Sequence, residues 1–427
     1  LGTNVKKETL AGITTFVSMA YILFVNPSVL GASGMDKGAV FTATALSAIL
    51  GCLLMAFLAN YPIAIAPGLG DNAFFTYSVV LAMGIKWQTA LAGVVVASII
   101  FTILTFFKIR EIVINAIPHN LKLAMAAGIG MFIAFIGLQG GGLVVASKSS
   151  LVQLGSLTVP TTWLTIFGLF VTALLMARKV PGSIFIGIVA TAILGLVTGL
   201  IKAPSQIVSS IPSMKPTFAV GIKHLGDVNT PQMWAVVLIF LLVAFFDTAG
   251  TLIGLAQQAG LMKNDKMPRI GQALMADSVS MLAGSVMGTT PTAAYVESSA
   301  GIAVGGRTGF TALVVAVLFG FGMFFSPLLS VVTTQVTAPA LIIVGALMAQ
   351  SLKEIEWDKF EIALPAFLTV IAMPLTYNIS YGFAFAFLIY PITMIAAGRK
   401  KELNPVVISL FFVFIVMLYV LNVLPSK

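Results

Sequence analysis

The sequence has few charged residues and almost none of the residue types that build catalytic or metal centres. Of its 427 residues, 9% are charged and 59% are hydrophobic, which excludes a water-soluble domain and is typical of a polytopic membrane protein. The single cysteine, Cys52, excludes an internal disulfide. The two histidines, His119 and His224, lie in polar connections without metal-ligand spacing. We therefore expect no metal, no cofactor and no enzymatic activity.

The net charge is +9, from 23 Lys and Arg against 14 Asp and Glu. A basic balance can indicate nucleic-acid binding, but Lys and Arg also collect in the cytoplasmic loops of membrane proteins. We favour the second reading and expect a lipid bilayer, and no nucleic acid, as the partner. The N-terminus is then cytoplasmic and the protein lies in the cell membrane. The basic residues that fall on one side of the predicted spans are Lys6, Lys7, Lys108, Arg110, Arg178, Lys179, Lys263, Lys266, Arg269, Arg307, Lys353, Lys359, Arg399, Lys400 and Lys401.

Hydropathy predicts about fourteen spans in a single integral membrane transporter domain, residues 1–427. A polar connection, 201–232, separates spans 7 and 8, and a further apolar segment, 405–424, either spans the membrane or lies along its surface. The first apolar run leads directly into further spans, unlike a cleavable signal peptide, and the start at Leu1 without Met indicates that residues precede it. The predicted spans are 10–31, 39–60, 63–82, 88–107, 121–142, 161–177, 182–200, 233–256, 270–288, 291–305, 308–328, 337–352, 361–378 and 380–397.

The chain divides into two halves with the same interruption. Pro67 and Gly68 break span 3, and Pro291 begins the polar span 10. Each half holds seven spans, an odd number, so the second half must enter the membrane from the opposite side. Carriers built from such inverted repeats bind substrate and ion at the midplane, where two discontinuous helices face each other. The sequence therefore predicts an all-α fold of two inverted seven-span repeats with half-helices in spans 3 and 10.

Four acids fall within predicted spans: Asp71, Asp247, Asp277 and Glu297. An ionised carboxylate at the centre of a bilayer costs at least ~2.5–3.5 kcal/mol. No Lys or Arg falls at mid-span, so we expect the four acids to have no cationic side chain to pair with. Protonation, a helix N-terminus or a bound ligand or cation would relieve the cost. The acids therefore predict a proton-coupled substrate site.

Glu297 and Asp247 are the main candidates for substrate binding and proton coupling. Glu297 lies among small and hydroxylated residues such as Ser298, and Thr251 shares a helical face with Asp247 by its i, i+4 spacing. We include Ser298 and Thr251 among the substrate-binding candidates and Asp277 among the proton-coupling ones. Each acid also has a structural interpretation: Asp247 can be hydrogen-bonded between helices, and Asp277 can brace spans 8 and 10.

The first broken span offers the other half of the predicted site. Asp71 and Asn72 stand where a half-helix would begin, and both are good N-cap residues. In the functional interpretation, the backbone N–H groups at this helix start point at the ligand and Asn72 contacts it. Either Phe74 or Phe75 stacks on a flat ring, or both belong to the core.

Four sequence blocks carry a resemblance to a known family. They are KETLAGITTF (7–16) with MAYI (19–22) and VNP (25–27), APG (66–68) with NAFF (72–75), FDTAGTL (246–252), and YVESSAG (295–301) with GGRTG (305–309). In combination they resemble the hypoxanthine/guanine/adenine permease branch of the nucleobase–cation symporter-2 family. The resemblance covers residues 7 to about 330, and the last two blocks are the most specific.

The resemblance implies a core sub-domain, 8–110 and 233–330, and a gate sub-domain, 118–200 and 335–424. It also implies that acids at the positions of Asp247 and Glu297 hold the base and take part in proton coupling, and that Asn72 is the polar residue of span 3. The family pattern has a neutral, usually apolar residue before that Asn. This chain has Asp71 there, which changes the local electrostatics.

We therefore predict a secondary active transporter that imports purine nucleobases, namely hypoxanthine or guanine, with adenine as a further candidate, by proton symport. A buried carboxylate can accept two N–H bonds from a purine, and such polar matching rejects analogues that leave a buried group unpaired. The alternatives are a uracil or xanthine carrier of the same fold and a Na⁺-coupled purine carrier. Two acids at the site argue against an anionic substrate. The sequence also shows no nucleophile–base pair of the kind that would indicate an enzyme. A homodimer through the gate sub-domain is left open.

Overall fold

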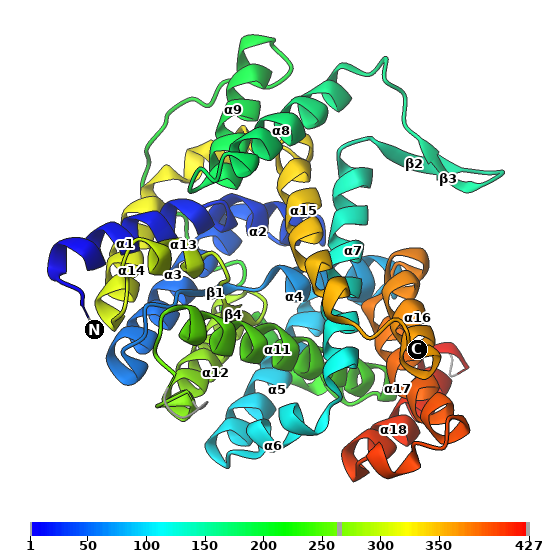
Figure 1. The fold of residues 1–427 in the computed structure, drawn as a ribbon. Coiled ribbons are helices and arrows are strands. Elements are labelled where there is room, and N and C mark those ends of the chain that lie inside the picture. The colour runs from blue at the N-terminus through cyan, green and yellow to red at the C-terminus, as the bar shows by residue number, and fades with distance from the viewer. Residues whose placement is uncertain (1, 263–266, 424–427) are drawn as a thin grey trace.

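A computed structural model describes residues 2–262 and 267–423 of the chain as a helical bundle (Figure 1). The basic residues Lys263 and Lys266 lie outside this range. The elements of the first half are α1 (Val5–Met19), α2 (Ile22–Gly31), α3 (Lys37–Leu54), η1 (Met55–Ala59), β1 (Ile65–Pro67), α4 (Leu69–Ala73), η2 (Phe74–Ala82), α5 (Trp87–Phe106), α6 (Ile109–Ala116), α7 (His119–Gly140), β2 (Val144–Ser147), β3 (Leu151–Leu154), α8 (Pro160–Ala177) and α9 (Ser183–Val197). Those of the second half are α10 (Val220–Lys223), η3 (Leu225–Val228), α11 (Pro231–Gln258), α12 (Ile270–Met287), β4 (Thr292–Ala294), α13 (Ser298–Ala303), α14 (Gly309–Gly322), η4 (Met323–Ser330), α15 (Thr334–Met348), η5 (Ala349–Glu354), α16 (Phe360–Thr376), α17 (Ile379–Ala396), η6 (Lys400–Glu402) and α18 (Pro405–Asn422).

Helices occupy all fourteen predicted spans, and spans 3 and 10 are interrupted as expected, although the sequence did not predict the short strands β1 and β4 at these interruptions. Nine helical stretches in the described ranges are long and apolar enough to cross a membrane. One of them is α18, which favours the spanning interpretation of the last apolar segment. The sequence did not predict the hairpin of β2 and β3 or the short helix α6 that links α5 to α7.

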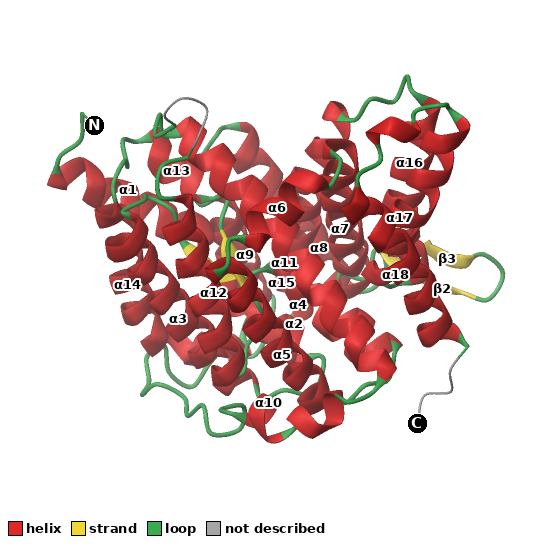
Figure 2. Ribbon diagram, turned by 90° about the horizontal axis from the view of Figure 1, so that it is seen from below, coloured by secondary structure: helices red, strands yellow, loops and turns green. Residues whose placement is uncertain are grey.

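The helices pack in two groups, which Figure 2 shows side by side. In one group α1 packs on α14, and α3 and α5 pack on α12. In the other group α7 packs on α15 and α16, and α16 packs on α17. These groups follow the predicted core and gate ranges, and their division into two moving sub-domains stays a prediction.

Glu8 fixes the first helix to the second half of the chain. Its carboxylate accepts hydrogen bonds from the backbone N–H groups of Arg307 and Thr308, at 3.0 and 3.3 Å. These groups stand at the N-terminus of α14, where a negative charge is favourable. The contact joins two of the sequence blocks that carry the family resemblance.

The two interrupted spans meet in a short antiparallel ladder at the centre of the first group. Strands β1 and β4 pair with Ala66 opposite Ala293. Further backbone bonds extend the ladder at both ends, from Gly68 to Pro291 and from Tyr295 to Ala64, each 2.9 Å. The pairing satisfies backbone groups that could not remain unpaired inside a membrane. It also fixes where α4 and α13 begin.

Candidate functional site

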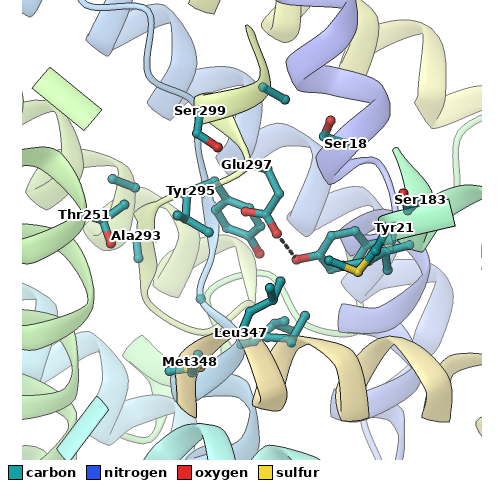
Figure 3. Close-up of a pocket in the computed structure, with 18 of the residues that line it drawn as sticks. Ser18, Tyr21, Ser183, Thr251, Ala293, Tyr295, Glu297, Ser299, Leu347 and Met348 are labelled. Atoms are coloured by element: carbon teal, nitrogen blue, oxygen red, sulfur yellow. Dashed lines mark hydrogen bonds between the residues drawn. The ribbon is translucent and has the colours of Figure 1, made fainter. Parts of the chain in front are cut away.

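One large cavity borders both interrupted spans. Its volume is about 870 Å³, enough for a small flat ligand. Figure 3 shows Glu297 and Tyr21 pointing toward each other across it, with Tyr295 and Ser299 beside them. Among the lining residues, the polar or glycine ones include Ser18, Tyr21, Gly68, Lys179, Ser183, Asp247, Thr251, Tyr295, Glu297 and Ser299, and the apolar ones include Ile129, Val243, Val344 and Leu347.

Glu297 is half-buried and lines this cavity immediately before α13. Its Oε1 accepts a hydrogen bond of 2.6 Å from the hydroxyl of Tyr21. Tyr295 lies beside it and donates its own hydroxyl to the carbonyl of Pro67, at 2.5 Å. The two tyrosines therefore hold the carboxylate and the strand crossing in fixed positions, and the remaining carboxylate lone pairs can receive ligand N–H groups.

Asp247 also lines the cavity, from the middle of α11. Its Oδ2 lies 2.9 Å from the position that a Cβ would occupy at Gly68. A side chain at position 68 would therefore collide with this carboxylate, and glycine lets the chain of the first broken span pass close to it. Thr251 lines the cavity too, although its hydroxyl donates to the backbone carbonyl of Asp247, at 2.8 Å.

Four of the predicted substrate-binding residues do not line the cavity but lie behind its wall: Asn72, Phe74, Phe75 and Ser298. Ser298 is fully buried, and its Oγ accepts a 3.0 Å bond from the N–H of Ala64. Asn72 is fully buried and its Oδ1 accepts a hydrogen bond from the hydroxyl of Thr290. These side chains hold the half-helices in place.

Phe74 and Phe75 are fully buried in the apolar core. Both pack on Phe240, with ring centroids 4.9 and 6.5 Å apart. The structure thus matches the core interpretation of the two rings. The N-cap interpretation of Asp71 and Asn72 is wrong, because Gly68 is the N-cap of α4 and both residues lie inside the helix.

The expectation that no intramembrane acid has a cationic partner is wrong for Asp277. Its Oδ2 lies 3.2 Å from Nη2 of Arg110, and both side chains are fully buried. The guanidinium also stacks over the ring of Phe101, with its Cζ 4.1 Å from the centroid. Lys108, in the left-handed conformation with φ 58°, turns the chain after α5 so that α6 begins and Arg110 enters the bundle. Asp277 does not line the cavity described above.

Replacing Arg110 with methionine is expected to destabilise the protein by about 3–5 kcal/mol, because it leaves Asp277 buried and uncompensated. The double replacement Arg110→Met with Asp277→Leu should recover most of this loss, since it removes both charges. Thermal unfolding of the purified protein in detergent measures both effects. The control is Lys359→Met, which breaks an exposed ion pair with Glu356 and should change little. Equal stabilities of the single and double variants would contradict a paired role.

Several lining residues were missing from the sequence-based site, chiefly Tyr21, Tyr295, Ser18, Ser183 and Lys179. Tyr21 had a detectable signal, because it is a polar aromatic residue inside an apolar run. Lys179 sits in the connection between α8 and α9 with φ 56°, and hydropathy places it only in a loop.

The fold and the site define a class: a multi-pass membrane carrier in which two interrupted spans cross beside a cavity lined by carboxylates. Among solved structures, the transmembrane domain of a cyanobacterium bicarbonate transporter, BicA, superposes with a TM-score of 0.63. The match covers 93% of this chain and 98% of that one at 16% identity, so it shows a shared fold alone.

The sequence matches the Permease family (Xan_ur_permease) over residues 6–385. It is 55% identical over 424 residues to the guanine/hypoxanthine permease PbuG of Bacillus subtilis (strain 168), covering 97% of this chain and 96% of that protein. It is 42% identical over 416 residues to the adenine permease AdeQ of Escherichia coli (strain K12), covering 97% and 93%. The chain belongs to this permease family, and the resemblance to nucleobase–cation symporters is confirmed.

Proposed function

We propose that this protein imports purine nucleobases together with protons. The proposed substrates are hypoxanthine or guanine, with adenine as a further candidate. The observation that carries the proposal is that Asp247 and Glu297 face one cavity at the crossing of the two interrupted spans. The relatives named above are purine permeases, and the match extends over nearly the whole chain.

Glu297 is the proposed anchor for the base. Guanine presents adjacent N–H donors, N1–H and the 2-amino group, along one edge, and a carboxylate fixed by Tyr21 can accept both, whereas hypoxanthine offers N1–H alone at that edge. Because Phe74 and Phe75 are in the core, the flat face of the base would lie against cavity walls such as Ile129, Val243 and Leu347 or the tyrosine rings. A two-carboxylate site matches hydrogen-bond donors and disfavours an anion.

Asp247 is the proposed proton carrier. It faces the cavity, and no described Lys or Arg forms an ion pair with it. An ionised acid is costly at this depth, so the carrier with a protonated Asp247 should cross between its two conformations more easily. One proton that moves inward through 100 mV supplies about 2.3 kcal/mol. This free energy can hold the purine concentration inside roughly fifty-fold above that outside.

The cavity extends toward the side that the basic residues mark as cytoplasmic. Lys179 lines it directly, and a second cavity that shares Thr251 and Ser299 with the first continues to Lys353 and Glu354. We interpret this conformation as inward-facing.

On the opposite side, Tyr377 closes the contact between the two helix groups. Its ring packs against Tyr77, Phe132 and Phe135, at centroid distances of 6.1, 5.6 and 6.2 Å. Its carbonyl also lies 3.5 Å from the hydroxyl of Ser78. Tyr77 and Ser78 belong to the first group and the other three rings to the second, so this aromatic contact must break for the cavity to open outward.

The variant Tyr377→Ala is expected to shift the population toward the outward-facing state by about two- to tenfold, because its pair with Tyr77 is the aromatic pair that joins the two groups and such a pair contributes about 0.5–1.5 kcal/mol. Cys52 is the only cysteine, so a Cys52→Ala, Ser78→Cys background can report the opening by labelling with a membrane-impermeant thiol reagent. Labelling should accelerate in the Tyr377 variant but not in Tyr381→Ala, whose hydroxyl bonds to Asn422 at 2.8 Å instead. Unchanged labelling would show that Tyr377 does not hold the gate.

Binding of labelled hypoxanthine to the purified protein tests the proposed substrate class. Unlabelled guanine and adenine should compete, and uracil, xanthine and bicarbonate should compete weakly. Competition by uracil or xanthine in preference to the three purines would replace the substrate assignment and leave the carrier itself in place.

A further inference from the structure

Asp71 has no part in the site described so far, yet its surroundings are unusual for a carboxyl. It lies inside α4, fully buried, and neither Oδ1 nor Oδ2 has a hydrogen-bond partner among the described residues. An ionised carboxylate without a partner is too costly to persist in such a place. The side chain is therefore neutral, and its O–H is a donor without an acceptor in this conformation.

The carboxylate of Asp247 lies across from the carboxyl group of Asp71. The position that a Cβ would occupy at Gly68 is 3.2 Å from Oδ2 of Asp71 and 2.9 Å from Oδ2 of Asp247. The two acids thus flank the same backbone position, with Asp247 on the cavity side, and the missing side chain at Gly68 leaves the gap between them open.

Few other titratable groups lie on the elements that surround α4. Helix α11 contributes Asp247 alone, and no charged residue lies within α2. Asp277 is already paired with Arg110 at 3.2 Å. The titratable groups carried by α4's packing partners η2, α2 and α7 are Tyr77 within η2, Tyr21 just before α2, and His119 and Lys122 in the first turn of α7.

We propose that Asp71 stays protonated throughout the transport cycle and donates its O–H to Asp247 once Asp247 has lost its proton. The proposal rests on the proposed function, in which Asp247 carries the transported proton. No proton leaves Asp71: the transported proton passes from Asp247 to water in the cavity, and the Asp71 O–H then stabilises the charge left behind. A hydrogen bond donated to the ionised form favours that form, so Asp71 is a positioning residue that promotes proton release.

This role predicts different effects for two replacements of similar size. Asp71→Asn keeps an N–H donor and should leave the pH midpoint of hypoxanthine-linked proton exchange close to that of the wild type. Asp71→Leu removes the donor, so Asp247 should hold its proton more tightly and the midpoint should move to higher pH by about one unit, a tenfold change in proton affinity. The measurement is hypoxanthine binding by purified wild type and variants across pH, with proton uptake or release followed by a pH dye.

Three outcomes would overturn the inference. Equal midpoints in all three proteins would show that Asp71 does not act on Asp247. Loss of proton exchange in Asp71→Asn would show that Asp71 itself carries the proton. A sodium requirement that disappears with either replacement would make the pair a sodium site.

If Asp71→Leu does not fold, Asp71→Ala gives a second test, because its smaller side chain also removes the donor and should raise the midpoint in the same direction. An unchanged midpoint there would also contradict the inference. A wild type that binds no purine would instead contradict the proposed function, so the two failures are distinguishable.

Discussion

Replacing Glu297 with glutamine is expected to abolish measurable purine binding. The carboxylate can accept two N–H bonds, whereas the amide keeps one acceptor and turns a donor toward a donor. Hydrogen bonds to a charged group are worth about 1.5–3 kcal/mol each. The loss of both charge-assisted bonds, only one of which a neutral bond can replace, corresponds to an affinity lower by about a hundredfold to ten-thousandfold. Equilibrium binding of labelled guanine, whose N1–H and 2-amino group can donate both bonds, to the purified variant measures this effect.

Two controls separate the role of Glu297 from a general disturbance of the cavity. Tyr21→Phe removes only the 2.6 Å bond that orients the carboxylate and should weaken binding by about tenfold. Glu354→Gln changes a carboxyl in the adjoining cavity and should leave affinity unchanged. Wild-type affinity in Glu297→Gln would show that the base is held elsewhere.

Replacing Asp247 with asparagine is expected to remove coupling to the proton gradient. An amide cannot take up and release the proton, so the accumulation ratio should fall from roughly fifty-fold at 100 mV toward unity. Exchange of labelled for unlabelled purine, which needs no net proton movement, should persist if the amide still fits the site. Uptake by proteoliposomes with an imposed pH gradient measures the first quantity, and counterflow measures the second.

The control for Asp247→Asn is Asp227→Asn, in the connection before α11, where the carboxyl bonds to Thr89 at 3.2 Å. It should accumulate purine like the wild type. Undiminished gradient-driven accumulation in Asp247→Asn would remove Asp247 from the coupling mechanism and leave Glu297 or Asp71 as the proton carrier.

The spans and the interruptions could be predicted because they follow from local composition. Apolar runs of membrane length identify the helices, and Pro67 and Pro291 with their small neighbours mark the places where a helix cannot continue. Asp247 and Glu297 could be placed at the site because an unpaired acid inside a membrane needs a cavity or a ligand. The structure puts both on one cavity.

The remaining parts of the site depend on distances between residues far apart in the sequence. Arg110 follows a span and looks like a loop residue, and only the turn at Lys108 directs its long side chain to Asp277. Phe74 and Phe75 have the chemistry to stack on a base, but packing on Phe240 places them in the core. Hydropathy does not contain this information.

Uptake of labelled hypoxanthine by proteoliposomes that contain only this protein tests the central claim most directly. With an acidic exterior and a membrane potential that is negative inside, we expect accumulation well above the external concentration, which a protonophore abolishes and replacement of Na⁺ by K⁺ outside does not change. Accumulation that survives the protonophore, or that requires Na⁺, would contradict proton-coupled purine import.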